Sequence, residues 1–201
     1  MRRVLKIGGS LLLQESLIET LQSWLQSQPP AQTIAIVGGG ELIDAIRRLD
    51  ARHPADPSWV HWQCVGLLRT TFEWTSAQLS QWSTCSTRQQ FQRLKSQASN
   101  SAVVGSQSQS SVTLVAVDSF YQSGDDPPLP EDWTTTTDAI AGWLAIMLAA
   151  DELVLLKSCA IEDGLSITEL AERGVVDAAL PGLADQLPPL RLIDFATEMN
   201  R

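Results

Sequence analysis

The sequence predicts an α/β protein in which a mostly parallel central sheet is flanked by helices. A short apolar segment runs directly into glycines and then into a helical pattern at residues 3–27, and the same arrangement recurs at residues 33–49. A third apolar run, at residues 153–156, follows a strong helical pattern and ends at a lysine. Apolar runs that alternate with helices are typical of parallel strands covered on both faces.

The first strand is expected at residues 3–7, with a helix over residues 11–27 after it. Between them stand Gly8 and Gly9, which let backbone N–H groups approach a ligand, and the N-terminus of a following helix favours negative charge. Lys6 places an ammonium group beside this turn, as a transferring phosphoryl group requires. A plain strand-to-helix turn is the alternative interpretation.

The second strand is the continuous apolar run at residues 33–37, and it ends in Gly38, Gly39 and Gly40. A helix follows whose apolar stripe is formed by Leu42, Ile43, Ile46 and Leu49. Parallel strands end at the same edge of a sheet, so both glycine turns should open where open α/β sheets bind ligands. Close packing of helix on sheet is the alternative role of these glycines.

The middle of the chain is less informative. A helix is expected at residues 59–74, where His61 lies on the apolar stripe as either a core histidine or a ligand. The remaining expectations are a helical or irregular stretch at 76–95, a polar surface connection at 96–111 with a candidate short strand at 102–104, a strand at 112–117 and a loop at 124–132.

The C-terminal part supplies two further charged residues at element boundaries. Asp138 begins a strong helix over residues 139–150, and Lys157 ends the strand at 153–156. Each has a plainer explanation, because Asp138 also suits a helix start and Lys157 also suits the end of an edge strand. A turn at 163–164, a helix at 167–172 and a final apolar segment at 190–195 complete the expected elements.

Composition narrows the class of protein. A length of 201 residues suits one domain, and the net charge of −9 argues against a nucleic-acid partner. No apolar run has the length of a membrane span or signal peptide, so we expect a cytoplasmic protein without a membrane partner. Three scattered cysteines and two histidines lack the spacing of metal ligands, so the cysteines are expected to be reduced thiols and no protein metal ligand is expected.

Lys6, both glycine turns, Asp138 and Lys157 all stand at the same kind of corner, where a strand ends or a helix begins. If the sheet is parallel, these corners share one edge. Two ammonium groups would then flank a transferring phosphoryl group, and one carboxylate would hold them in place. The sequence therefore predicts a single anion-binding pocket.

Three motifs carry a resemblance to a known family. K-I-G-G-S at residues 6–10, I-V-G-G-G at 36–40 and T-T-D-A-I-A-G-W-L-A at 136–145 resemble the amino-acid kinase superfamily, which includes acetylglutamate, carbamate, uridylate and isopentenyl phosphate kinases. H-W at 61–62, D-E-L-V-L-L-K-S at 151–158 and G-V-V-D at 174–177 resemble its branch of small kinases of methanofuran biosynthesis.

The resemblance implies a three-layer, carbamate-kinase-like fold in a single domain, with an acceptor side at residues 1–132 and a shortened nucleotide side at 133–201. It also implies ATP and Mg²⁺ as cofactors and a homodimer. The implied roles are catalytic for Lys6, Asp138 and Lys157; nucleotide-binding for Gly8, Gly9, Ser10, Lys157, Ser158, Asp163 and Gly164; and acceptor-binding for Gly38, Gly39, Gly40, His61 and Thr137.

The implied activity is direct in-line phosphoryl transfer from ATP to a small phosphate monoester, such as an aminomethylfuran methyl phosphate, which gives a diphosphate. No general base is needed because the acceptor oxygen is already ionised, in agreement with the lack of an obvious catalytic His or Glu. A ligand-binding or regulatory protein that keeps the fold without turnover is the alternative. A dinucleotide-binding oxidoreductase is disfavoured because neither glycine cluster reads G-x-G-x-x-G.

Overall fold

The computed structural model describes residues 1–100, 110–162 and 164–199. The elements of the N-terminal half are β1 (Arg2–Ile7), η1 (Gly9–Leu13), α1 (Leu17–Ser27), β2 (Gln32–Val37), α2 (Glu41–Arg52), α3 (Pro57–Gln78), β3 (Ser83–Cys85) and α4 (Arg88–Asn100). Those of the C-terminal half are β4 (Ser111–Val115), η2 (Val117–Ser119), α5 (Thr137–Met147), β5 (Glu152–Lys157), α6 (Ile167–Glu172), η3 (Leu180–Gln186), β6 (Leu190–Asp194) and α7 (Phe195–Met199).

The six described strands form one sheet in the order β3-β4-β2-β1-β5-β6, and every neighbouring pair is parallel. The predicted parallel α/β fold is therefore confirmed. In the register, Ile7 at the end of β1 lies between Val37 of β2 and Leu156 of β5. These three central strands consequently end at one edge, and the turns that follow them open on the same side.

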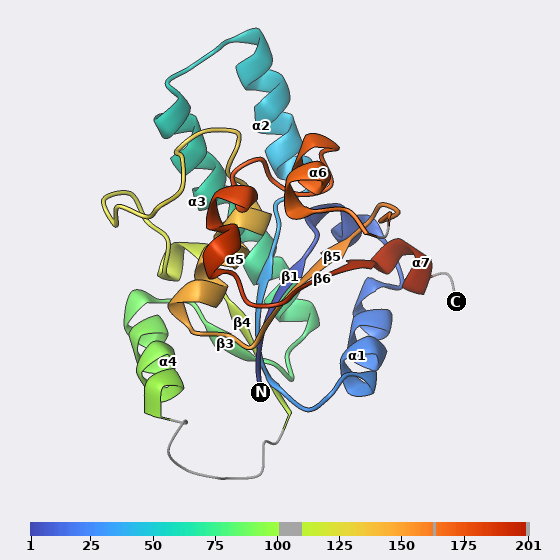
Figure 1. The fold of residues 1–201 in the computed structure, drawn as a ribbon. Helices are drawn as coiled ribbons and strands as arrows, with labels where there is room; N and C mark the ends of the chain where they lie inside the picture. Colours follow the sequence, from blue (N-terminus) through green and yellow to red (C-terminus); the bar gives the residue numbers. More distant parts are fainter. Residues whose placement is uncertain (101–109, 163, 200–201) are drawn as a thin grey trace.

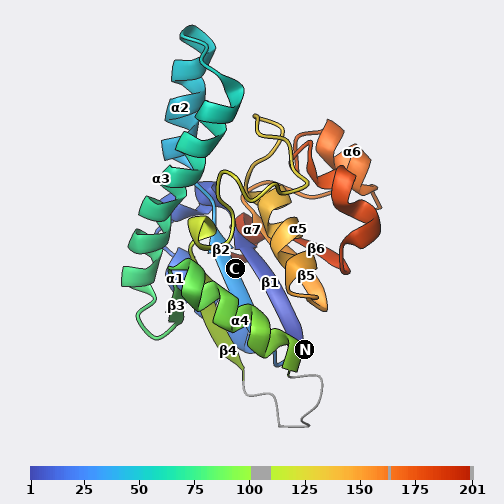
Figure 2. The ribbon, with the colours of Figure 1, turned by 90° about the vertical axis from the view of Figure 1, so that its left-hand side faces the viewer.

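Helices cover both faces of the sheet, which gives three layers (Figures 1 and 2). One core joins Val4, Ile36 and Leu155 to helices α3 and α5, and the other joins Leu5 and Ile7 to α1 and α7. Neighbouring residues of β1 enter different cores because side chains alternate between the two faces of a strand. The continuous apolar strands of the sequence follow from this double burial.

The hairpin of α2 and α3 extends beyond the carboxyl ends of the strands (Figure 2). None of the α2 side chains is fully buried, and Leu42 and Leu49 are exposed, so the apolar stripe expected for α2 does not enter the core as a whole. Ile43 alone packs against the main core. Periodicity predicts such a stripe, but it cannot show that a helix projects from the sheet.

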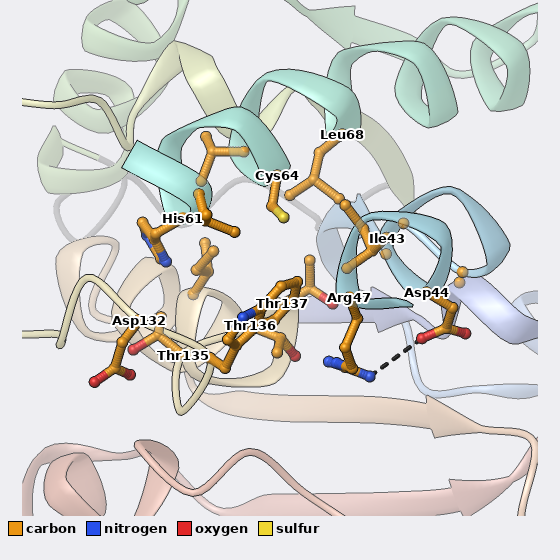
Figure 3. A pocket seen from close by; sticks show the side chains of 18 of the residues that line it. Ile43, Asp44, Arg47, His61, Cys64, Leu68, Asp132, Thr135, Thr136 and Thr137 are labelled. Carbon is orange, nitrogen blue, oxygen red and sulfur yellow. Dashed lines mark hydrogen bonds and ion pairs between the residues drawn. The ribbon is translucent and has the colours of Figure 1, made fainter. Parts of the chain in front are cut away.

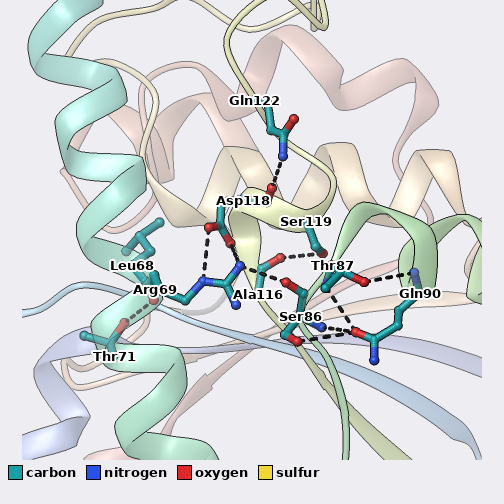
Figure 4. A network of polar contacts seen from close by, with 10 residues as sticks. All are labelled: Leu68, Arg69, Thr71, Ser86, Thr87, Gln90, Ala116, Asp118, Ser119 and Gln122. Atoms are coloured by element: carbon teal, nitrogen blue, oxygen red, sulfur yellow. Dashed lines mark hydrogen bonds and ion pairs between the residues drawn. The ribbon is translucent and has the colours of Figure 1, made fainter.

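Arg69 fixes α3 to the strands. Its guanidinium donates to both carboxylate oxygens of Asp118, at 3.1 and 2.6 Å, and to the carbonyl oxygen of Ser86 at 2.8 Å (Figure 4). Ser86 follows β3, and Asp118 lies in η2 just after β4. This fork therefore holds the middle of α3 against the carboxyl ends of two strands, next to the cavity described below.

One local expectation was wrong, one strand was not expected, and one expectation lies outside the described residues. The helix expected at 11–27 is interrupted, because Gln14 is extended between η1 and α1, and a 3₁₀ turn rather than an α-helix follows the first glycines. β3 was missed because it has three residues, two of them exposed, and so lacks a periodic signal. The candidate strand at 102–104 falls outside the described residues.

Candidate functional site

Two lysines stand at the carboxyl ends of neighbouring strands. Lys6 is the second-last residue of β1, Lys157 is the last residue of β5, and the register pairs Lys6 with Leu155. Because side chains alternate along a strand, both lysines share the face that carries Val4 and Leu155. Helix α5 packs on that face, so both ammonium groups point towards it.

Helix α5 places Asp138 between these lysines. Lys6 Nζ lies 2.9 Å from Asp138 Oδ1, and Lys157 Nζ donates a hydrogen bond of 2.6 Å to Oδ2. Burial alone would raise the pKa of Asp138, but the attraction of the two ammonium groups outweighs it and holds the pKa below its usual value. The predicted convergence of these three residues is thus confirmed by their distances.

The two glycine turns are in contact with one another. A Cβ atom on Gly9 would lie 2.1 Å from the nitrogen of Gly40 and 2.7 Å from the carbonyl carbon of Gly38. Gly40 has φ of +53°, a conformation that side chains disfavour. No side chain fits between these turns, so the bare backbone of Gly9 and of Gly38–Gly40 lines the same space as Lys6.

Part of this glycine backbone is already hydrogen-bonded within the sheet. Gly8 N donates to Leu156 O at 3.0 Å, and Gly38 N donates to Ile7 O at 2.9 Å. The N–H group of Gly8, expected to face an ATP phosphate, is therefore used to extend the strand pairing instead. Its glycine character has a steric reason, because a Cβ there would lie 2.7 Å from Leu156 O.

A cavity of about 240 Å³ opens beside Lys6 and the two glycine turns (Figure 3), whereas Lys157 and Asp138 are not among the described residues that line it. Lys6, Gly9 and Gly38–Gly40 form one end of it. Apolar side chains from three helices line much of the remainder, and these are Ile43 of α2, Val60, Val65 and Leu68 of α3, and Ile140 of α5. The cavity therefore joins an end formed by Lys6 and bare backbone to a chamber with aliphatic walls, into whose lining polar side chains such as Arg47, Asp132 and Thr137 also enter.

Trp133 and Arg47 line another side of the cavity. The guanidinium of Arg47 lies 4.9 Å from the ring centre of Trp133, and Trp133 Nε1 donates to Asp50 Oδ2 at 2.7 Å. Arg47 also pairs with Asp44 at 3.1 Å on the same helix. These contacts connect α2 to the segment before α5, so the two together form one wall of the chamber.

His61 lines the cavity and is also held in the core. Its Nε2 lies 3.0 Å from the hydroxyl of Tyr121, and its ring packs edge-to-face on the rings of Tyr121 and Trp62. Burial lowers the pKa of His61, although Asp132 and Glu131 partly oppose that shift. His61 is accordingly a neutral, packed side chain on the cavity wall, and its role in acceptor binding stays a prediction.

Some of the other predicted site residues line the cavity and some do not. Thr137 lines the cavity at the start of α5, next to Gly38. Ser10 of η1 also lines the cavity and Ser158 does not; both are exposed, and their hydroxyl oxygens lie 2.6 Å apart, which joins η1 to the turn after β5. Gly164 is an exposed turn residue with φ of +81° that does not line the cavity, and Asp163 lies outside the described residues.

Three residues of the site were not predicted. Arg47 follows Ile43 by one helical turn, so periodicity places both on one face, but an arginine on an exposed helix gives no functional signal. Trp133 precedes the threonine run and lacks a pattern of its own. Asp177 belongs to the G-V-V-D motif, which does not indicate its contacts; the structure shows it hydrogen-bonded to Thr136 and Ala139 at the start of α5.

The described part of the chain has no group of three or more His, Cys, Asp or Glu side chains that could hold a metal ion. Asp138 is the acid that reaches the lysines beside the glycine turns, and both of its oxygens contact them. With both Asp138 oxygens paired to ammonium groups, a magnesium ion at this site would be held mainly by phosphate oxygens of a bound nucleotide, as Mg²⁺ commonly is. None of the described helices is both long and apolar enough to cross a bilayer.

No family model and no curated protein matches the sequence. Solved structures do match the fold. Uridylate kinase from Archaeoglobus fulgidus is 18% identical with a TM-score of 0.57, and the match covers 99% of this chain and 94% of that chain. UMP kinase from Bacillus anthracis is 12% identical with a TM-score of 0.63, covering 96% and 87% of the two chains.

Aspartate kinase from Synechocystis is 15% identical with a TM-score of 0.54, and the match covers 100% of this chain but 36% of that one. These proteins belong to the amino-acid kinase superfamily. The chain therefore has the amino-acid kinase-like α/β fold, as its motifs indicated. The division into acceptor and nucleotide sides and the methanofuran branch stay predictions.

Proposed function

We propose that the protein is an ATP-dependent phosphotransferase that acts on a small metabolite. The observation that carries the proposal is the pair Lys6 and Lys157 on the buried carboxylate of Asp138, beside two glycine turns with no room for side chains. Phosphoryl transfer requires positioning and neutralisation of charge on the equatorial oxygens, and this arrangement supplies both.

The proposed reaction is a single displacement. An acceptor phosphate oxygen attacks the γ-phosphorus of ATP, the bond from that phosphorus to the β,γ-bridging oxygen breaks, and ADP leaves with that electron pair. Lys6 and Lys157 neutralise the charge on the transferring group, while Asp138 keeps both ammonium groups in place. No base is assigned, because a phosphate monoester is already ionised near neutral pH. When bound, Mg²⁺ neutralises charge on the nucleotide phosphates.

The chamber supports a compact acceptor. Its volume of about 240 Å³ lies below the range of about 300–1,000 Å³ typical of sites for larger ligands. Five aliphatic side chains and the ring of Trp133 line it, and the polar part of its described lining consists of charged, hydroxyl and histidine side chains with no Asn or Gln. A small ring that carries a phosphate, such as an aminomethylfuran methyl phosphate, suits such walls better than uridine monophosphate does.

The test is product formation. Purified protein with Mg²⁺ and ATP is incubated separately with an aminomethylfuran methyl phosphate, UMP and isopentenyl phosphate, and phosphorus NMR follows diphosphate and ADP. We expect a diphosphate from the furan substrate. Stable binding of Mg-ATP with no product from any acceptor would favour the alternative, a binding or regulatory protein that keeps the fold.

The proposal also extends to assembly and location. By resemblance we propose a homodimer, which light scattering of the purified protein would reveal as twice the mass of 21.9 kDa. We also propose a cytoplasmic location, and fractionation of cells that make the tagged protein tests it.

A further inference from the structure

The side chain of Asp177 caps helix α5 from a distant part of the chain. Asp177 Oδ2 accepts hydrogen bonds from the backbone N–H groups of Thr136 and Ala139, both at 2.9 Å, and Oδ1 accepts one from the hydroxyl of Thr136. Thr136 is the N-cap residue, but its side chain does not cap the helix. Asp177 therefore does what an N-cap side chain normally does.

These contacts lie on either side of Asp138, the residue that pairs with both lysines. Asp138 lies between Thr136 and Ala139, so both flanks of its position are held by the one carboxylate of Asp177. Two residues after Asp177, the backbone makes a further contact with the chain before α5, because Ala179 N donates a hydrogen bond of 2.9 Å to Thr134 O. The first turn of α5 is thus fixed to residues 177–179 and not only to its own helix.

Asp177 also lies close to the charged groups of the site. Burial and the neighbouring negative charge of Asp138 raise the pKa of Asp177, while its contacts with Thr136 and Ala139 and the charge of Lys6 oppose that rise. The negative charge of a second acid beside Asp138 is unfavourable there, and the hydrogen bonds from Thr136 and Ala139 partly offset that cost. The N-terminus of α5 favours an anion at this place.

We propose that Asp177 is a positioning residue for phosphoryl transfer, which holds the Asp138 carboxylate, and through it Lys6 and Lys157, in the reactive arrangement. This inference rests on the proposed kinase function. Asp177 does not line the described cavity, so it acts through α5 rather than on a substrate. Displacement of a reacting arrangement by about 1 Å can cost about 100-fold in rate.

The lysines give a readout that is independent of activity. The chain has only three of them, Lys6, Lys95 and Lys157, so protein with isotope-labelled lysine gives three sets of side-chain NMR signals. In Asp177→Ala we expect the Lys6 and Lys157 signals to shift and the Lys95 signals, on α4, to stay in place. In Asp177→Asn the amide oxygen can still accept both N–H groups, so we expect near wild-type spectra.

Ser166→Ala is the matched control. Ser166 caps α6 through a hydrogen bond from Glu169 N, so this variant loses a helix cap of the same kind, in a helix that does not line the cavity. We expect it to lower stability without moving the signals of Lys6 or Lys157. A shift equal to that of Asp177→Ala would overturn the proposal, because any lost cap would then have the same effect.

The kinetic test uses the same variants. We expect kcat of Asp177→Ala to fall by about 10- to 100-fold with a smaller change in KM for Mg-ATP, and Asp177→Asn to recover most of the rate. Unshifted lysine signals in folded Asp177→Ala would overturn the proposal. If that variant does not fold, Asp177→Ser takes its place, because its single short hydroxyl cannot accept both N–H groups, and unshifted signals in that folded variant would overturn the proposal in the same way.

The two proposals fail separately. A wild-type protein that phosphorylates no acceptor would remove the kinase function, whereas the lysine spectra would still show whether Asp177 fixes the arrangement. Normal kinase activity in Asp177→Ala would remove the positioning role and leave the kinase function intact.

Discussion

Lys157 and Asp138 are joined by a hydrogen bond of 2.6 Å between the end of strand β5 and the first turn of helix α5. The other carboxylate oxygen of Asp138, Oδ1, lies 2.9 Å from Lys6 Nζ, so this one acid connects two neighbouring strands to one helix. Loss of one partner from a buried ion pair leaves the other charge uncompensated. The group proposed to organise the reaction therefore also contributes to stability.

The first prediction concerns this contribution. Asp138→Asn leaves two ammonium groups close together without an anion, so we expect the free energy of unfolding to fall by about 3–5 kcal/mol. Denaturant titration monitored by circular dichroism measures it. Glu162→Gln breaks the exposed ion pair with Arg173, and we expect that control to change stability by less than about 1 kcal/mol. Equal losses in both variants would contradict the assignment.

The second prediction concerns the rate. Lys6→Ala removes one cation from the proposed transition state while Asp138 keeps its bond to Lys157, so the fold should persist. We expect the rate of ADP formation to fall by about 100- to 1,000-fold. Lys95→Ala, on α4, is the control and should keep the wild-type rate. An unchanged rate in Lys6→Ala would refute its catalytic role.

The convergence at this edge could be predicted from the sequence because it follows from topology. Two apolar runs end in glycines and a third ends in Lys157, and parallel strands present such ends together. The position of Asp138 at a helix start could be read from the onset of helical periodicity. Alternation along the strand then accounts for the placement of Lys6 on the face of α5.

Other parts of the site depend on contacts that leave no local pattern. Asp177 caps a helix that begins some forty residues earlier, and a cap supplied from elsewhere has no signature in the sequence of that helix. The contact between Gly9 and Gly40 depends on the close approach of two turns. The wall at Trp133 depends on Asp50, in a helix that projects from the sheet.

The third prediction tests that contact between glycines. Gly9→Ala would place its Cβ 2.1 Å from the nitrogen of Gly40, so the backbone must shift, and we expect a loss of about 1–3 kcal/mol or more in the free energy of unfolding. Gly66 lies on α3 with no atom within 4 Å of a Cβ added there. Gly66→Ala should instead add about 0.5–1 kcal/mol. The opposite order of stabilities would contradict the arrangement.

The fourth prediction concerns pH. Burial lowers the pKa of His61, so the unfolded chain takes up a proton at this residue, near pH 6.5, before the folded protein does. Its stabilising contribution is therefore complete above about pH 6.5 and is lost as the pH falls from there towards the folded pKa. Unfolding free energies measured from about pH 8 to about pH 5 should decline less in His61→Gln than in the wild type.

His53 provides the control for that measurement, because it is the other histidine and is exposed at the end of α2. We expect His53→Gln to keep the wild-type decline. If the unfolding free energy declined less in His53→Gln than in the wild type, and as much in His61→Gln as in the wild type, the pH dependence would come from His53. That result would contradict the prediction that the buried His61 is neutral in the folded protein.

The fifth prediction concerns the wall of the chamber. Trp133→Phe keeps an aromatic ring under Arg47 but removes the N–H group that donates to Asp50 at 2.7 Å. The wall then loses its hydrogen bond to α2 and keeps only the contact with Arg47, without a change at the lysines. We expect KM for the acceptor to rise severalfold with kcat nearly unchanged, because an interaction made equally in the ground and transition states is lost. Trp59→Phe is the matched control, since Trp59 is exposed on α3 and does not line the cavity. A fall in kcat with constant KM would show that Trp133 acts on the reacting groups and not on the binding of the acceptor.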